Sequence, residues 1–244
     1  MEVHAHTHTA RKKWTHYFWE FLMLFLAVFC GFLAEYQLEH KIEKDRGKQY
    51  MTTMVEDLKS DTAMFSRNIR ERASRIQMID SLTTLLNSPD RDLKGNDIYF
   101  FARSISPPTN IFPNDRTIQQ LKSSGNLRLI RNKDISNSIM AYDQLVRQTL
   151  FELDDEIEIR SEYRQLASKV FNTTVFHEMI ATETITKPNG NPRLYTSNPD
   201  FINEFIGGLQ YFKRVHQAQL IRNEKLLTQA KELSDFIKNE YHLK

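Results

Sequence analysis

The stretch YFWEFLMLFLAVFCGFLAEYQLEH, residues 17–40, decides the fold of this chain because it contains its longest apolar run. No residue from Phe21 to Ala34 carries a charge. As a helix, residues 17–34 would be about 27 Å long, close to the hydrocarbon thickness of a bilayer at about 30 Å. The stretch therefore predicts a transmembrane helix over residues 17–35.

The residues that flank this stretch favour a membrane segment over a buried core helix. Residues 11–13 are basic, and aromatic residues typical of membrane interfaces lie at both ends, namely Trp14, Tyr17, Trp19 and Tyr36. A cleaved signal peptide is disfavoured, since cleavage after Ala34 would place Phe32 where a small residue is required. A lipoprotein site at Cys30 is disfavoured because Phe29 precedes it. We therefore expect one uncleaved span.

The charges on the two sides of the span predict its orientation. Basic residues occur on both sides, so a count of Lys and Arg alone is ambiguous. The positions nearest the carboxyl end of the span carry Glu35 and Glu39 with only Lys41. We therefore expect a basic, His-rich cytoplasmic leader at residues 1–16, and a domain outside the cytoplasmic membrane after the span.

One carboxylate lies inside the aromatic end of the span. Glu20 follows His16 by four residues, which places both on one face of a helix. An ionisable residue in a span is a functional hypothesis. Glu20 either pairs with a partner or handles protons, or it anchors the helix at the interface.

Small residues in the span allow close approach of another helix. Ala27 with Gly31, and Cys30 with Ala34, each form a pair of small residues four positions apart. Such pairs also occur in ordinary spans. The sequence predicts lateral contacts with other membrane proteins, or self-association, through Glu20, Ala27, Gly31 and Ala34.

The remainder of the chain has the periodicity of long helices. Residues 36–50 are expected to form a helical connector, and residues 51–244 a helical-bundle domain. From Met51 to Leu86 apolar residues recur at steps of three and four, as in a coiled coil. The predicted stripe comprises Met51, Val55, Leu58, Thr62, Phe65, Ile69, Ala73, Ile76, Ile79, Thr83 and Leu86.

Further helices are predicted over residues 96–105, 116–124, 133–176 and 199–237. Asn114 or Asp115 is expected to cap the second of these, Asn132 the third and Asn198 the last, where Pro199 suits the first helical position. The middle of the third helix, LDDEIEIRSEYR, is highly charged, and its acidic run ELDDEIE, residues 152–158, is expected to be a solvated face. Together the patterns predict an all-α fold, with one N-terminal transmembrane helix followed by an elongated antiparallel helical bundle.

The segment TIQQLKSSGNLRLIRNKDISNSIMAYDQL, residues 117–145, contains a compact motif. Its positions are Leu121, Ser124, Gly125, Asn126, Leu127, Leu129, Ile130, Asn132, Ile139 and Tyr142. It resembles the signature LxxSGNLxLIxN, followed by Ile and Tyr, of a family of short single-pass bacterial membrane proteins, chiefly from the Bacteroidetes. The resemblance implies a bacterial inner-membrane protein with a periplasmic domain, and it implies no activity.

The motif has two physical interpretations. Gly125 suits the left-handed residue that ends a helix, and Asn132 suits an N-cap. Alternatively, the helix ends together with Ser123, Ser124, Arg128 and Arg131 form an anion-binding corner. The first interpretation is favoured because each residue has a capping or packing role. The candidate corner is Ser124, Gly125, Asn126, Arg128 and Asn132.

Other signals of chemistry are weak. His4, His6 and His8 are spaced so that they could bind a metal ion, but no Cys or carboxylate cluster lies beside them. The sequence has no Gly-rich phosphate loop, HExxH, GxSxG or CxxC motif. The net charge of +2 gives no strong attraction to nucleic acid. We therefore expect no catalysis, no cofactor and no nucleic acid partner.

Two functions remain open. The first is a structural or interaction subunit that scaffolds partner proteins, with the lipid bilayer and other membrane proteins as its partners. The alternative is a sensory ligand-binding module. A cytoplasmic leader of about 16 residues is too short for an output domain, so such a sensor would signal through a separate partner.

Overall fold

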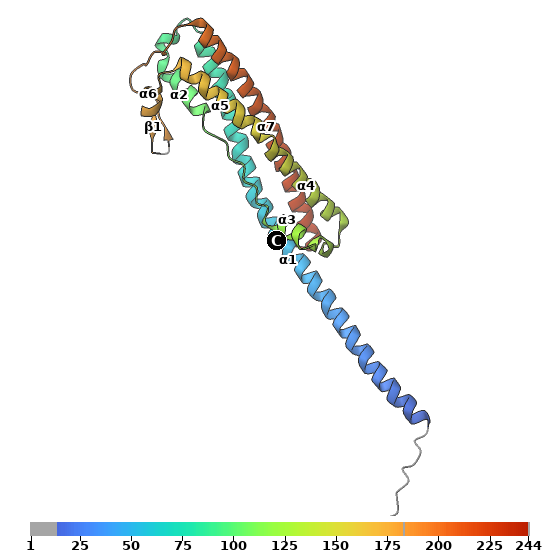
Figure 1. Ribbon diagram of the computed structural model, residues 1–244. Coiled ribbons are helices and arrows are strands. Elements are labelled where there is room, and N and C mark those ends of the chain that lie inside the picture. The colour runs from blue at the N-terminus through green and yellow to red at the C-terminus, as the bar shows by residue number, and fades with distance from the viewer. Residues whose placement is uncertain (1–13, 183, 244) are drawn as a thin grey trace, which may run out of the picture. The chain divides into compact units, whose positions relative to one another are not determined.

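The computed structural model of the chain is mostly helical and describes residues 14–182 and 184–243 (Figure 1). Its elements are α1 (Trp14–Leu86), the 3₁₀ helix η1 (Arg91–Leu93), α2 (Gly95–Ile105), α3 (Arg116–Ser123), the 3₁₀ helix η2 (Asn126–Leu129), α4 (Lys133–Phe151), α5 (Leu153–Val170), α6 (Thr173–Glu178), β1 (Ile180–Ala181), β2 (Thr184–Ile185) and α7 (Pro199–Tyr241). The two short strands pair antiparallel. The chain divides into two compact units, Met1–Gln49 and Tyr50–Lys244. The predictions of a mostly helical chain and of a long apolar N-terminal helix are confirmed.

In the first unit, α1 carries its apolar side chains on the surface. From Phe21 to Ala34 every residue is exposed except the half-buried Leu22. The rings of Phe21, Phe25 and Phe29 stack along one face, with centroids 6.2 and 5.9 Å apart. By length and composition, α1 can cross a membrane.

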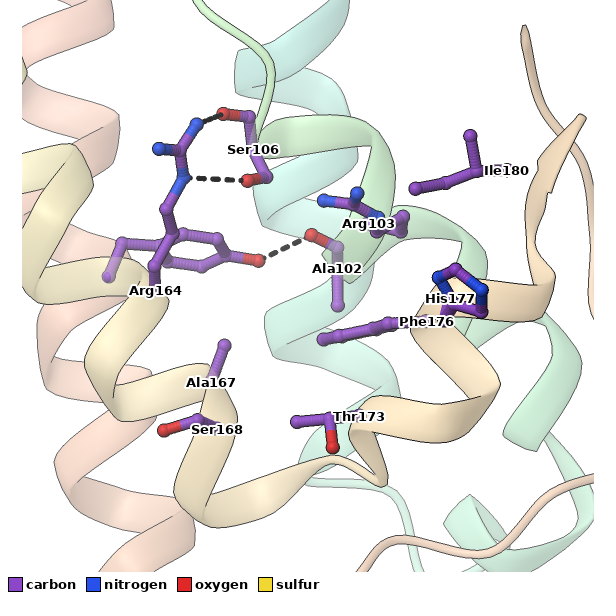
Figure 2. A pocket seen from close by; sticks show the side chains of 11 residues that line it. Ala102, Arg103, Ser106, Arg164, Ala167, Ser168, Thr173, Phe176, His177 and Ile180 are labelled. Carbon is purple, nitrogen blue, oxygen red and sulfur yellow. Dashed lines mark hydrogen bonds between the residues drawn. The ribbon is translucent and has the colours of Figure 1, made fainter. Parts of the chain in front are cut away.

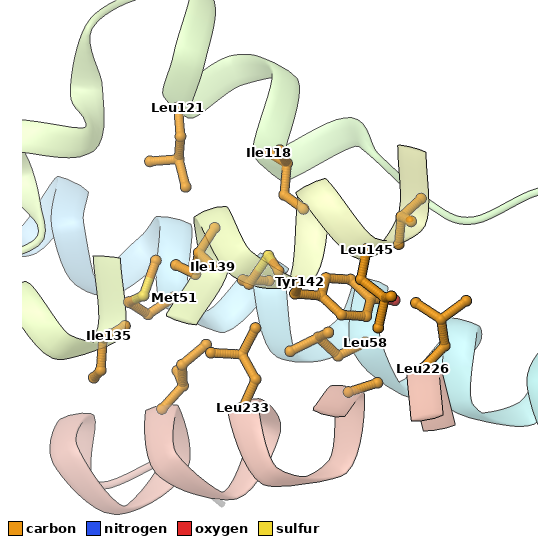
Figure 3. Packing of buried hydrophobic residues seen from close by; sticks show 14 of the residues in the cluster. Met51, Leu58, Ile118, Leu121, Ile135, Ile139, Tyr142, Leu145, Leu226 and Leu233 are labelled. Atoms are coloured by element: carbon orange, nitrogen blue, oxygen red, sulfur yellow. The ribbon is translucent and has the colours of Figure 1, made fainter. Parts of the chain in front are cut away.

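In the second unit, the helices bury two separate hydrophobic clusters. The first cluster joins the Met51–Phe65 part of α1 with α3, α4 and the second half of α7 (Figure 3). Its buried members include Leu58, Ile139, Tyr142 and Leu233. Helix α7 lies against both α4 and α5.

The second cluster is richer in aromatic side chains. It joins the Ile79–Leu86 part of α1 with α2, α5 and the first half of α7. Tyr163 lies with its ring centroid 5.5 Å from that of Phe205 and 5.2 Å from that of Phe212. Aromatic rings at these separations add to the free energy gained from apolar burial.

Several predicted helix ends are confirmed. The Asn132 side chain accepts a hydrogen bond from Asp134 N at 3.0 Å, and the Asn198 side chain accepts one from Asp200 N at 2.8 Å. Gly125 has φ of 65°, the left-handed conformation expected after α3. These short-range signals depend only on neighbouring residues, which explains why the sequence reveals them.

At the start of α3, the side chain of Asn114, one of the two expected caps, accepts a hydrogen bond from Arg116 N at 3.4 Å. Asp115 occupies the N-cap position, but its side chain makes no capping hydrogen bond. The carboxylate of Asp57 on α1 accepts from Thr117 N at 3.0 Å instead. A distant helix therefore supplies the acceptor that the first turn of α3 requires.

The predicted single helix over residues 133–176 is wrong, because the chain forms α4, α5 and α6 there. At the first break, the Glu152 carbonyl accepts from Gln219 Nε2 at 3.3 Å, and its carboxylate accepts two hydrogen bonds from Arg222 at 2.9 Å. At the second break, Asn172 is extended and its side chain accepts from Thr174 N at 3.0 Å to cap α6. Contacts with α7 thus stabilise one break and a local cap the other.

Candidate functional site

The interior of the second unit contains a layer of polar side chains between its two hydrophobic clusters. On α1 the layer lies between Phe65 and Ile79, and on α7 it lies between Phe212 and Leu226. We call this set the polar layer: Asn68, Arg72 and Arg75 of α1, Glu156 of α5, and His216, Gln219 and Asn223 of α7. Each of these residues is buried.

An ion pair forms the centre of the polar layer. Arg72 Nη2 lies 2.8 Å from Glu156 Oε2, and the side chains are 0% and 2% exposed. Arg160 adds a second positive charge, with Nη1 at 3.5 Å from Glu156 Oε1.

His216 is the third member of this centre, and its surroundings keep it neutral. Its Nδ1 lies 3.2 Å from Arg72 Nη1. Because a guanidinium group only donates, Nδ1 must accept, and the ring proton belongs on Nε2. Burial lowers the pKa of His216 to about 2, helped by the charges of Arg72, Arg75 and Arg160.

The polar layer is costly to bury. Among the described residues, no hydrogen-bond partner exists for Arg75 Nη1, His216 Nε2, Gln219 Oε1 or Asn223 Oδ1. Each such atom costs about 1–3 kcal/mol relative to its hydrated state. Replacing a buried ion pair by apolar side chains is often neutral or stabilising. The layer is therefore not explained by stability alone, and a role in fixing how the helices pair is the better hypothesis.

Two sequence-based expectations are corrected by this layer. The middle of the predicted α1 stripe is displaced by one position, since Ile69, Ala73 and Ile76 are only half-buried while their neighbours Asn68, Arg72 and Arg75 are buried. The acidic run ELDDEIE, residues 152–158, is not a fully solvated face, because Glu156 is buried within it. One signal in the sequence could have revealed the layer. Residues 68, 72 and 75 follow the helical spacing that places them on the same face of α1 as Phe65 and Ile79.

The motif of residues 117–145 packs against α1 at the end of the first cluster. Asp61 accepts from the Tyr142 hydroxyl at 2.6 Å and from Asn114 N at 2.7 Å. Burial raises the pKa of Asp61. Asn126 Nδ2 donates to the Tyr50 hydroxyl at 2.8 Å.

The predicted motif corner is brought together by short-range contacts. The Ser124 hydroxyl interacts with the Gln120 carbonyl, and Asn126 Nδ2 lies 2.6 Å from Ser124 Oγ. With the cap at Asn132 and the left-handed Gly125, these contacts account for the motif by capping and packing. Arg128 lies in η2 beside them.

The predicted span residues lie on the surface of α1. His16 Nε2 lies 3.3 Å from Glu20 Oε1, as expected from their spacing. Ala27, Gly31 and Ala34 are exposed, and a Cβ added at Gly31 would meet no atom within 4 Å in the part of the chain that the structure describes.

The proposed metal ligands cannot be placed. His4, His6 and His8 lie outside the described residues. Within the part of the chain that the structure describes, no group of three or more His, Cys, Asp or Glu side chains could hold a metal ion.

A pocket that sequence reasoning missed opens beside the second cluster (Figure 2). We call it the α2–α5 pocket; its volume is about 330 Å³. It is lined by Ala102, Arg103 and Ser106 at α2, Tyr163, Arg164, Ala167 and Ser168 of α5, Thr173, Phe176 and His177 of α6, and Ile180 of β1. Because these residues come from four separate elements, no local pattern in the sequence groups them.

Hydrogen bonds hold one wall of the pocket in place. Arg164 donates from Nε to Ser106 Oγ at 3.1 Å and from Nη2 to the Ser106 carbonyl at 3.0 Å. The Tyr163 hydroxyl donates to the Ala102 carbonyl at 2.6 Å. Carbonyls near the end of α2 thereby obtain donors from α5.

No family model, curated protein or solved structure matches this chain. The resemblance of residues 117–145 to a Bacteroidetes membrane-protein family therefore stays a prediction.

The first testable consequence concerns the buried ion pair. Arg72→Met and Glu156→Met should each lower the free energy of unfolding by about 3–5 kcal/mol, because each leaves one buried charge without its partner. The double variant should lose far less than the sum of the two. Urea unfolding of the full chain in a mild detergent, followed by near-ultraviolet circular dichroism, measures all three.

The matched control is the exposed pair Lys169–Glu204, whose side chains are 45% and 48% exposed. Lys169→Met should change stability by less than about 1 kcal/mol. If the losses at Arg72 and Glu156 simply add, the two charges do not depend on each other.

The second consequence concerns acid. His216 has a folded-state pKa of about 2, below its ordinary value of 6.5. Between these values the unfolded chain binds the proton preferentially, so stability is lost as the pH falls below 6.5. We expect the contribution of His216 to fall by about 1 kcal/mol from pH 6.5 to pH 5.5.

His216→Gln should remove this part of the pH dependence while retaining an acceptor for Arg72. His177→Gln, at an exposed imidazole, is the control and should retain it. Unfolding curves recorded at the two pH values test this prediction. An equal change in the free energy of unfolding between the two pH values for the wild type and for His216→Gln would contradict the assignment.

Proposed function

We propose that this protein is a non-catalytic subunit with a single membrane span, which scaffolds or binds partner proteins. Residues 1–16 form the cytoplasmic leader, residues 17–35 the span and residues 36–50 the connector. Residues 51–244 form an antiparallel helical bundle outside the cytoplasmic membrane. The observation that carries this proposal is the exposed, uncharged surface of α1 from Phe21 to Ala34.

The chemistry of α1 supports a lipid environment for this surface. Large apolar side chains such as Phe21, Met23 and Leu24 are at least 65% exposed in the first unit. Water around such surface costs about 25 cal/mol per Å². A helix also satisfies its own backbone hydrogen bonds, which a segment in lipid requires. The bacterial cytoplasmic membrane and the periplasm follow from the motif resemblance and the charge pattern around the span.

The surface of the span supports contacts with another helix. Ala27 and Gly31 leave a shallow strip on α1 with no side chain of the first unit above Gly31. His16 and Glu20 add a polar contact near one end. We propose that this strip binds the span of another membrane protein or of a second copy.

The membrane proposal is tested by alkaline carbonate extraction of cell membranes. The wild-type chain should remain in the membrane pellet. Val28→Arg places a charge near the middle of the span at a cost of about 2.5–3.5 kcal/mol on insertion scales, so the fraction in the pellet should fall. Val28→Leu is the matched control. Release of the wild-type chain by carbonate would refute the span.

The assembly proposal is tested by purification in a mild detergent with mass determination. A partner or a second copy should accompany the wild-type chain and be lost from the Gly31→Leu variant; Glu20→Gln should weaken the assembly. Because a Cβ at Gly31 would meet no atom of the described residues within 4 Å, such a loss would report a contact with another molecule. Val28→Leu again serves as control. A lone chain in every sample would exclude lateral assembly.

A second candidate function is a sensory ligand-binding module that signals through a separate membrane partner. The α2–α5 pocket favours it, since a concave site with an apolar lining and a few polar groups is typical of small-molecule binding.

A further inference from the structure

We infer that the α2–α5 pocket binds a small organic anion that carries a carboxylate or phosphate group on a compact apolar body. This inference rests on the second candidate function, ligand binding by the second unit, and specifies the ligand class.

The lining of the pocket is positively charged. Arg103 and Arg164 line it together with His177, and none of the described residues that line it is Asp or Glu. Arginine remains charged at every accessible pH. An anionic ligand would supply the negative charge that this lining lacks.

Arg164 is already positioned to receive such a ligand. Its two hydrogen bonds go to Ser106 Oγ and to the Ser106 carbonyl, both of which are neutral acceptors. No carboxylate pairs with Arg164 among the described residues. The guanidinium therefore has a fixed orientation and, among the described residues, no carboxylate partner, which are the properties of a preorganised anion site.

Arg103 supplies the second cation, and its contacts are incomplete. Its guanidinium carbon lies 5.9 Å from the centroid of the Phe176 ring. Its Nε is buried and has no hydrogen-bond partner within the described part of the chain. A guanidinium in this state can donate two parallel hydrogen bonds to a carboxylate or phosphate.

The two arginines come from two different elements of the pocket wall, Arg103 from α2 and Arg164 from α5. Figure 2 shows Arg164 with Ser106 on one side of the view, and Arg103, Phe176 and His177 on the other. The His177 imidazole adds a further hydrogen-bond donor or acceptor. The charged head of a ligand would therefore face the arginines.

The remaining lining determines the body of the ligand. Ala102, Ala167, Phe176 and Ile180 give the pocket apolar surface, and Ser168 and Thr173 add two hydroxyls. The volume of about 330 Å³ lies at the lower end of the range for ligand pockets, about 300–1,000 Å³. A ligand with one ring or a short chain fits this volume better than a dinucleotide.

The experiment uses the full chain in a mild detergent and four probes of one shape, measured by isothermal titration calorimetry. Benzoate and phenyl phosphate are the two anionic arms, benzamide is the neutral probe and benzylamine the cationic one. At least one anion should bind about tenfold more tightly than benzamide, which corresponds to about 1.4 kcal/mol. Whichever anion binds more tightly identifies the head group as carboxylate or phosphate.

Two variants assign the binding to the pocket. Arg103→Gln should weaken anion binding about tenfold or more, since it removes the charge but keeps a polar side chain of similar length. Arg214→Gln, at an exposed position of α7 outside the lining, should leave binding unchanged. Far-ultraviolet circular dichroism checks that both variants remain folded.

The outcomes separate the ligand class from ligand binding itself. If benzamide binds as tightly as the anions, or if Arg103→Gln has no effect, the second unit binds small molecules but the anion assignment is overturned. If none of the four probes binds, both the inference and the second candidate function fail. Membrane anchoring is unaffected by either result.

Discussion

The contact between Arg72 of α1 and Glu156 of α5 constrains the whole second unit. Both side chains are buried and their charged atoms are 2.8 Å apart. Water therefore cannot replace either charge as the partner of the other. A shift of one helix by a turn, about 5.4 Å, would separate them and leave two unpaired charges in the interior. The apolar clusters on either side are less directional, because burial of apolar area does not depend on one partner. The ion pair therefore disfavours other registers of α1 against α5.

The breaks around α5 determine where the pocket can exist. At Asn172 the chain leaves the direction of α5, and α6 brings Phe176 beside Tyr99 of α2, with ring centroids 5.5 Å apart. Phe171, at the break itself, stacks on Phe176 at 5.1 Å. A helix that continued straight from α5 would carry Phe176 and His177 away from α2. The part of the pocket lining that α6 supplies thus depends on the cap at Asn172 and on aromatic packing.

The two units distribute polarity in opposite ways. The first unit exposes apolar side chains from Phe21 to Ala34, whereas the second unit buries Arg72, Glu156 and His216. An apolar surface is stable in lipid, and a buried polar group is stable when neighbouring helices supply partners. The proposed membrane location accounts for the exposed apolar side chains of the first unit. The contacts within the polar layer account for the buried charged side chains of the second unit.

Features that depend on residues close together in the chain were predictable from the sequence. The long run of uncharged residues indicated the N-terminal part of α1. The caps at Asn132 and Asn198 and the left-handed conformation of Gly125 were predictable because each depends on residues only a few positions away. Sequence reasoning missed the polar layer, although its spacing on α1 was visible, because the partners of Arg72 come from α5 and α7. The breaks at Glu152 and Asn172 and the α2–α5 pocket were likewise missed, although Asn172 followed by Thr173 carried a local cap signal. Tertiary structure decided these features, since the free energy of a buried charge depends on residues that only folding brings within a few ångströms.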